Sequence, residues 1–139
     1  MERADELEPD GLVRVLAVVE DHPDMRALLR LLLRPERGFR VHGEASSADE
    51  ALEVLGTDLR PGVIVLDQSL EGPLTGLEVA PLLKAQAPNA RIVLFSAHDL
   101  ASEAAANPAV DRYVRKDRIA ELPAVLRSLA DADTAAGGH

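Results

Sequence analysis

The 139-residue chain contains no cysteine and no tryptophan, and its only aromatic residues are Phe39, Phe95 and Tyr113. Without cysteine, the chain can form neither a disulfide nor a thiolate metal site. So few aromatic rings disfavour a flavin site, a nucleobase stacking site or a platform for single-stranded nucleic acid. The chemistry of this chain must therefore come from other side chains.

Long apolar runs and an excess of positive charge are also missing. No run of about 18 apolar residues occurs, and no basic segment followed by an apolar one opens the chain. We therefore expect no membrane span and no signal peptide, and a cytoplasmic protein. The formal net charge is −9, whereas nucleic-acid binders usually present a basic face, so we expect no direct binding of nucleic acid. Lysine is scarce, since only Lys84 and Lys116 among the 15 basic residues are lysines.

The composition suits one domain with a real core. Hydrophobic residues make up 47% of the chain, and a chain of this length buries roughly two-thirds of its unfolded surface. The core pattern covers residues 12–130, which we expect to form the domain. Residues 1–11 are acidic and are expected to form a mobile arm, and residues 131–139 are expected to be a disordered tail.

Between these ends, apolar runs alternate with helical patterns. Strands are predicted over residues 13–19, 39–45, 62–67, 91–96 and 110–114. Helices are predicted from Pro23 or Asp24 to residue 34 and over residues 48–58, 75–86, 100–106 and 122–130. Ser47 and Glu50 form a capping-box signature for the second helix, whereas Pro81 fits poorly inside the third. The repeated alternation of strand and helix predicts a parallel sheet with helices on both faces.

Polar side chains follow these strands at their carboxyl ends. Glu20 and Asp21 follow the first strand, Asp67 ends the third, Ser96 ends the fourth and Lys116 follows the fifth. Taken singly, each has a simple structural explanation, because an Asp after a strand is most often a turn former or a helix cap. Taken together, they predict one polar crevice, because parallel sheets bind ligands beyond the carboxyl ends of their strands.

Four segments carry a family resemblance: "VVEDHPDMRALLRLLL", "VIVLDQSLEGPLTGLEV", "IVLFSAHD" and "DRYVRKD". Their order and spacing resemble those of the receiver domain of two-component response regulators, over residues 13–130. The resemblance implies an α/β fold, a doubly wound five-stranded parallel sheet of order 2-1-3-4-5 in a flavodoxin-like (CheY-like) three-layer sandwich. It also implies a signalling phosphoacceptor rather than an enzyme, one that catalyses only its own phosphorylation and dephosphorylation.

The resemblance implies a magnesium site among the clustered carboxylates. Asp67 would accept a phosphoryl group from a sensor histidine kinase or a phosphotransfer protein. Asp21 and Asp67 would bind Mg²⁺ directly together with the carbonyl of Ser69, and Glu20 would act through a metal-bound water. A hard divalent cation suits this role, because Mg²⁺ prefers oxygen ligands. The same preference disfavours His22 as a ligand.

The resemblance also implies how a signal would leave the crevice. Lys116 would neutralise charge on the phosphoryl group, and Ser96 would donate its hydroxyl to a phosphoryl oxygen. Tyr113 would then turn inward, while Ser69 and His98 would tune the lifetime of the phosphoryl group. The face formed by the last two strands and the last helix would control binding of a downstream protein target or an output domain, and could form a homodimer.

Two departures from the family pattern leave alternatives open. Residue 20 is Glu where Asp is commoner, and the loop over residues 68–76 is one residue longer than usual with its proline displaced. The first alternative is a receiver-like interaction module that is never phosphorylated. A haloacid-dehalogenase-like phosphatase with Asp67 as nucleophile is disfavoured, because that family has a second Asp where Ser69 stands.

Overall fold

The computed structural model describes residues 8–137, and within them the chain alternates strands and helices. Its strands are β1 (Val13–Val19), β2 (Phe39–Val41), β3 (Glu44–Ala45), β4 (Gly62–Asp67), β5 (Ala90–Ser96) and β6 (Arg112–Arg115). Its α-helices are α1 (Pro23–Leu32), α2 (Ala48–Leu55), α3 (Gly76–Gln86), α4 (Ala101–Ala105) and α5 (Leu122–Gly137). Two 3-10 helices, η1 (Pro35–Arg37) and η2 (Lys116–Glu121), complete the set. No helix in this described part of the chain is long and apolar enough to cross a membrane.

The strands form one parallel sheet of order β2-β1-β4-β5-β6, and β3 also pairs with β1. This confirms the predicted doubly wound order. The second predicted strand, residues 39–45, is divided into β2 and β3, which keep the same register along β1, with Val15 opposite Val41 and Val18 opposite Glu44. Gly43 lies in the gap, and a Cβ there would overlap Val54 Cγ1, so α2 packs closely over this glycine.

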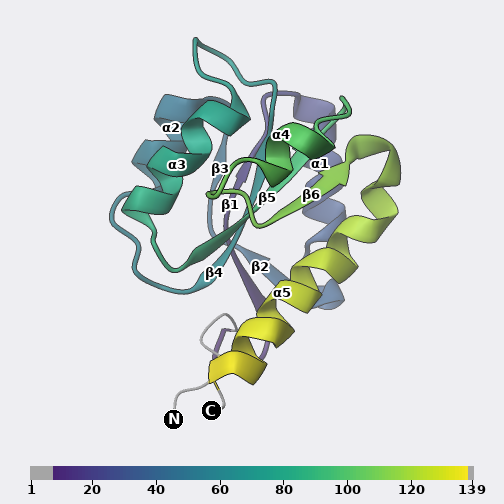
Figure 1. The fold of residues 1–139 in the computed structure, drawn as a ribbon. Helices are drawn as coiled ribbons and strands as arrows, with labels where there is room; N and C mark the ends of the chain where they lie inside the picture. Colours follow the sequence, from purple (N-terminus) through teal and green to yellow (C-terminus); the bar gives the residue numbers. More distant parts are fainter. Residues whose placement is uncertain (1–7, 138–139) are drawn as a thin grey trace.

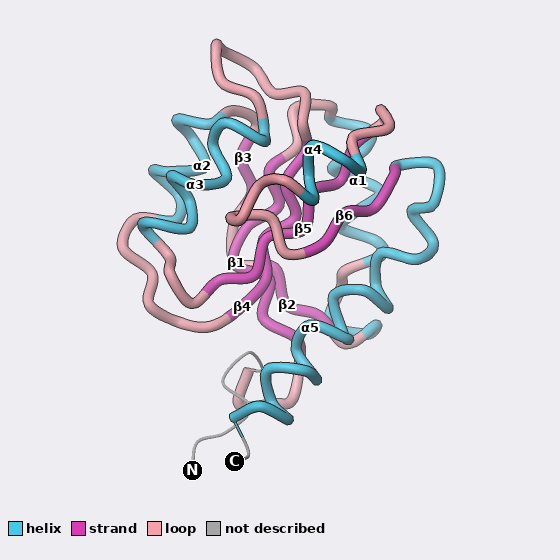
Figure 2. Tube along the Cα trace, in the orientation of Figure 1, coloured by secondary structure: helices cyan, strands magenta, loops and turns pink. Residues whose placement is uncertain are grey.

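Helices cover both faces of the sheet and bury a core on each side (Figures 1 and 2). On one face, α2 and α3 pack over alternate strand residues such as Ile64 and Leu66. On the other face, α1 and α5 pack over Val63 and Val65. Because neighbouring residues of a strand point to opposite faces, the unbroken apolar runs of β1, β4 and β5 are what a sheet covered on both sides requires.

Pro81 lies inside α3, where the absence of its N–H would normally leave the carbonyl four residues earlier without a partner. That carbonyl belongs to Leu77, and it accepts a 3.0 Å hydrogen bond from Asn107 Nδ2 instead. Thr75 and Glu78 form a capping box at the start of this helix. The helix therefore tolerates its proline because both its first turn and the freed carbonyl have partners.

The predicted capping box of α2 forms only in part. Ser47 accepts a hydrogen bond from the N–H of Glu50 at 3.1 Å. The Glu50 carboxylate does not return to Ser47, because it accepts the N–H of Ser46 at 2.6 Å. The N-terminus of α2 is thus linked to the end of β3.

Structure is described at both ends of the domain, and the mobile arm and the disordered tail stay predictions. Residues 1–7 of the expected mobile arm lie outside the described residues, but Glu8 and Asp10 are held against the sheet edge. Glu8 pairs with Arg14 and His42, and Asp10 pairs with Arg40, because the acidic segment meets basic side chains of β1 and its neighbour. At the other end α5 continues to Gly137, beyond residue 130 where a tail was predicted.

Candidate functional site

The carboxyl edge of the sheet brings the predicted polar residues together. Glu20 follows β1, Asp67 ends β4 and Lys116 follows β6. Since the strands are parallel and β1 pairs with β4, these side chains all line one cavity of about 430 Å³. It is lined by Glu20, Asp21, His22, Asp24, Met25, Leu28, Asp67, Ser69, Ala97 and Lys116.

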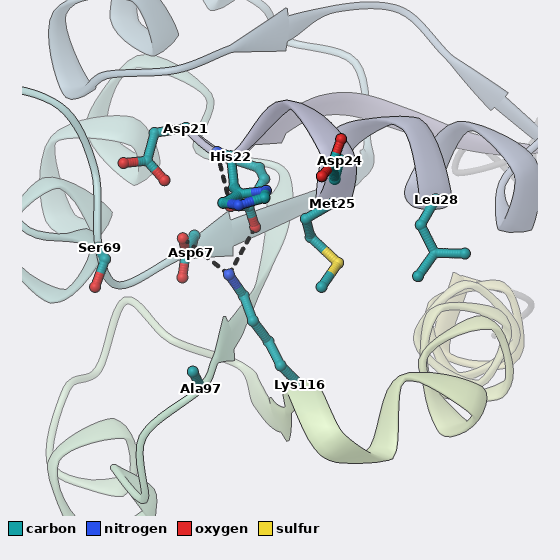
Figure 3. Close-up of a pocket in the computed structure, with 10 residues that line it drawn as sticks. Asp21, His22, Asp24, Met25, Leu28, Asp67, Ser69, Ala97 and Lys116 are labelled. Carbon is teal, nitrogen blue, oxygen red and sulfur yellow. Dashed lines mark hydrogen bonds and ion pairs between the residues drawn. The ribbon is translucent and has the colours of Figure 1, made fainter.

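Lys116 makes an ion pair with two buried carboxylates (Figure 3). Its Nζ lies 2.9 Å from Glu20 Oε1 and 3.1 Å from Asp67 Oδ2. Glu20 is 1% exposed and Asp67 is 3% exposed. The other Glu20 oxygen, Oε2, accepts the N–H of His22 at 3.1 Å, and the Glu20 carbonyl accepts Arg26 Nη1 at 2.8 Å. The first acidic residue is therefore fixed by both its side chain and its main chain.

The crevice changes the acidity of its charged groups. Burial, together with repulsion from Glu20, raises the pKa of Asp67 to about 6, and the attraction of Lys116 offsets only part of this change. Burial acts to lower the pKa of Lys116, but the Glu20 and Asp67 carboxylates outweigh it and raise that pKa. At pH values above about 6 the site therefore holds an ionised Asp67 beside one firmly charged ammonium group.

An all-oxygen cation site fits this arrangement. Carboxylate oxygens of Glu20, Asp21 and Asp67 all lie within 4.8 Å of one another. Glu20 Oε1 is buried and is paired with Lys116 Nζ at 2.9 Å. Figure 3 places Asp21 and Ser69 beside Asp67, away from the apolar wall that Met25 and Leu28 form. The cluster is typical of a Mg²⁺ site, because hard oxygen ligands with free lone pairs converge there.

The loop between β4 and α3 folds back tightly on Asp67. The N–H of Gly76 donates to the carbonyl of Gln68 at 3.0 Å, and the N–H of Leu77 donates to Gln68 Oε1 at 2.8 Å. A Cβ at residue 76 would overlap the main-chain carbonyl oxygen of Asp67, so only glycine fits there. Ser69 lies in this loop, and its N–H donates a hydrogen bond to the Asp67 carboxylate.

The residues that line the crevice do not include Ser96, His98 or Tyr113. Ser96 is fully buried, and its Oγ accepts the N–H of His98 at 3.1 Å. The cavity wall at this point is formed by Ala97 instead. The Tyr113 hydroxyl donates to the His98 carbonyl at 2.6 Å and accepts the N–H of Leu100 at 3.1 Å.

Sequence reasoning did not single out three residues that shape the site. Arg26 holds the Glu20 carbonyl, and Met25 and Leu28 form an apolar wall. Met25 and Leu28 are three residues apart on α1, and this spacing places them on the same face of the helix. That spacing was a usable signal, whereas nothing in the sequence indicates that an arginine will bind a main-chain carbonyl.

Comparison with known proteins gives a consistent result. The family model of the response regulator receiver domain matches residues 16–127. The nitrate/nitrite response regulator protein NarL of Escherichia coli K12 is 32% identical over 104 residues, which cover 73% of this chain and 47% of NarL. The transcriptional activator protein ExaE of Pseudomonas putida is 36% identical over 84 residues, 60% of this chain and 38% of ExaE. The chain thus spans about half the length of NarL and a smaller share of ExaE.

Solved structures agree with this family. The response regulator TrrA of Thermotoga maritima, in complex with Mg²⁺-BeF, is 30% identical with a TM-score of 0.65, covering 81% of this chain and 97% of that chain. The RcsB response regulator of Salmonella typhimurium is 19% identical with a TM-score of 0.75, covering 88% of this chain and 62% of that chain, and supports the fold alone. On the strength of the matched domain model, the sheet order and the acidic crevice, this chain belongs to the response regulator receiver domain family of two-component signalling.

Proposed function

We propose that this chain is a phosphorylatable receiver in which Asp67 accepts a phosphoryl group from a sensor histidine kinase or a phosphotransfer protein. One observation carries the proposal. Asp67 lines the cavity, with carboxylate oxygens of Glu20 and Asp21 within 4.8 Å and Lys116 Nζ at 3.1 Å. A carboxylate in this setting has both a path to a phosphodonor and groups that can balance the incoming charge.

The proposed reaction is a nucleophilic displacement at phosphorus. An ionised Asp67 oxygen attacks the phosphorus of a phosphohistidine, the P–N bond breaks, and the histidine nitrogen leaves with the electron pair. The product on this chain is an aspartyl phosphate. Although the pKa of Asp67 is raised to about 6, it still lies below pH 7–8, so the carboxylate is mostly ionised there, as an attacking group must be.

The remaining roles follow from the positions of the side chains. Asp21, Asp67 and the carbonyl of Ser69 would hold Mg²⁺, with Glu20 acting through a water. When bound, Mg²⁺ supplies positive charge that offsets the negative charge of the transferred group. Lys116 stays beside Asp67 as a compact cation.

The switch uses groups that do not line the crevice. Ser96 moves toward the phosphoryl group to donate its hydroxyl, and Tyr113 turns into the space that Ser96 leaves. Ser69 and the exposed His98 border the region and tune the lifetime of the phosphoryl group. The face around β5, β6 and α5, near residues 99–130, then binds a downstream protein target or an output domain, or a second copy of the chain. With a net charge of −9, the chain acts through protein contacts rather than by direct binding of nucleic acid.

Phosphorylation with a small donor tests the proposal. The protein is incubated with acetyl phosphate and Mg²⁺, and intact mass is measured for the wild type, Asp67→Asn and Asp24→Asn. Asp24 also lines the cavity but is exposed on α1, so its variant is a matched control. We expect a labile adduct of one phosphoryl group on the wild type and on Asp24→Asn only. A wild type that gains no adduct would instead support the interaction module that is never phosphorylated, which the lengthened loop after Asp67 favours.

A further inference from the structure

The lengthened loop between β4 and α3 is anchored at its middle as well as at its ends. The N–H of Glu71 donates to the carbonyl of Ser46 at 3.1 Å, and Ser46 Oγ lies 3.2 Å from Glu71 Oε1. Ser47 and Glu71 also form an isolated parallel bridge. Gly72 follows with φ of 89°, a conformation that favours glycine, so the chain turns away directly after this contact.

The segment formed by Ala45 and Ser46 also binds the end of β1 that carries the acidic pair, Glu20 and Asp21. The carbonyl of Ala45 accepts the N–H of Glu20 at 2.8 Å. The adjacent residues Ala45 and Ser46 therefore bind two different parts of the chain: the end of β1 that carries Glu20 and Asp21, and the loop that carries Ser69. These two parts carry Asp21 and Ser69, so residues 45–46 link two of the groups that we propose to hold the cation.

Ser46 has enough donors for both carboxylates that approach it. Its hydroxyl carries one proton, while Glu50 Oε1 lies 3.0 Å and Glu71 Oε1 lies 3.2 Å from Oγ. Glu50 Oε1 already accepts the N–H of Ser46 at 2.6 Å. The hydroxyl is therefore free to donate to Glu71, and each carboxylate then has a partner. The hydrogen bond from the N–H of Ser46 is the largest cause that lowers the pKa of Glu50.

We propose that Ser46 and Glu71 are positioning residues that hold the β4–α3 loop against the acidic pair, so that Ser69 stays within reach of a cation bound by Asp21 and Asp67. The inference rests on the proposed function, because it assumes that the crevice binds Mg²⁺. A longer loop has more conformations to lose when a ligand orders it. A loop that is already anchored avoids much of that cost when the cation binds.

Mg²⁺ titration of Ser46→Ala tests the inference, with binding followed by the amide NMR shifts of Asp21 and Ser69. We expect the dissociation constant to rise roughly threefold or more, the change that corresponds to one lost hydrogen bond. Hydrogen exchange at the Glu71 amide should become faster. Ser46→Thr keeps the hydroxyl and should restore both values, while Ser102→Ala, at an exposed serine of α4, should change neither.

A second pair of variants covers the case in which Ser46→Ala does not fold. Glu71→Ala removes the partner carboxylate, and Glu53→Ala removes the same charge from an exposed position on α2. Weaker Mg²⁺ binding in Glu71→Ala alone supports the inference, and equal affinities in the two variants overturn it. A wild type that binds Mg²⁺ but gains no phosphoryl adduct contradicts the proposed function alone. A wild type that binds no Mg²⁺ contradicts both proposals.

Discussion

The hydroxyl of Tyr113 donates a 2.6 Å hydrogen bond to the main-chain carbonyl of His98, two residues beyond Ser96. The same hydroxyl accepts the N–H of Leu100. The aromatic side chain that we propose to move is therefore tied to the loop that links β5 to the short helix α4. Any inward turn of the ring must break these two bonds, which makes them a measurable part of the switch.

Replacing the tyrosine hydroxyl should loosen this loop. Tyr113→Phe removes both hydrogen bonds and should lower the free energy of unfolding by about 1–2 kcal/mol. The Leu100 amide, which loses its acceptor, should exchange its hydrogen faster in the variant. Urea unfolding and hydrogen exchange measure the two effects. Unchanged exchange at Leu100 would show that the bond does not hold the loop in solution.

Ser96→Ala should separate phosphorylation from its readout. Tyr113 is the only tyrosine and the chain has no tryptophan, so tyrosine fluorescence reports this site alone. Beryllofluoride with Mg²⁺ should change the fluorescence of the wild type, and the change should be much smaller in Ser96→Ala. Acetyl phosphate should still add a phosphoryl group to Asp67 in this variant. Equal fluorescence changes in both proteins would contradict the proposed coupling.

The raised pKa of Asp67 predicts a pH dependence of stability in the presence of a metal chelator. The folded-state pKa is about 6 against an ordinary value of 3.8, so between these values the folded state binds more protons than the unfolded state. Stability from this group is therefore present below pH 4 and is lost as the pH rises to about 6. The loss is of the order of 3 kcal/mol, since one pKa unit corresponds to about 1.4 kcal/mol.

Asp67→Asn isolates this contribution, because amide and carboxyl have nearly the same shape. At pH 8 in chelator the variant should be more stable than the wild type, and the difference should vanish near pH 4. Urea unfolding of both proteins from pH 4 to pH 8 measures it. A variant that is less stable than the wild type at pH 8 would mean that the ion pair with Lys116 outweighs burial.

Asp21 should be required for Mg²⁺ binding. The cation binds the folded state only, so Mg²⁺ should raise the melting temperature of the wild type. Asp21→Ala should abolish most of this rise, because it removes one of the three clustered carboxylates. Asp24→Ala, at the exposed rim of the same cavity, should keep the full rise. If Asp21→Ala kept the full Mg²⁺-dependent rise in melting temperature, Asp21 would not be a ligand of the cation.

Lys116 should matter for folding as well as for signalling. Lys116→Met leaves Glu20 and Asp67 buried without a counter-charge, and breaking such a pair costs about 3–5 kcal/mol. The loss should be greatest near pH 8 and smaller near pH 5, where Asp67 becomes protonated. Lys116→Arg keeps the charge and should lose less stability. Denaturant unfolding at the two pH values measures these effects, and an equal loss at both would argue against charge as the cause.

Much of the fold could be predicted from the sequence, because strands that are buried on both faces of a sheet are continuous apolar runs. The apolar runs that end at Val19, Asp67 and Ser96 match β1, β4 and β5. The interruption of the second strand was not predictable, because it depends on how closely Val54 of α2 approaches Gly43. The Asn107 side-chain amide that binds the Leu77 carbonyl, and so lets Pro81 remain in α3, is equally remote in sequence.

The site was predictable as a group of residues but not as a geometry. Strand-end positions indicated that Glu20, Asp67 and Lys116 would meet, and the structure brings them within ion-pair distance. That Lys116 contacts Glu20 as closely as Asp67 depends on side-chain conformations, which spacing does not reveal. It was also not predictable that Ala97 rather than Ser96 would line the cavity. Neighbouring residues of a strand point in opposite directions, so a shift of one residue at the end of β5 changes which side chain faces the opening.

The scarcity of lysine has a practical consequence for chemical labelling. Lys84 donates to the Ala90 carbonyl at 2.7 Å and pairs with Asp111, and Lys116 pairs with Glu20 and Asp67. Amine-acylating reagents attack neutral, accessible amines, whereas each of these side chains is a half-buried ammonium group held by a carboxylate. The chain thus offers reagents only two ε-amino groups, both shielded. The rate at which Lys116 becomes acylated, measured by mass spectrometry, would therefore report whether its ion pairs with Glu20 and Asp67 are intact or broken.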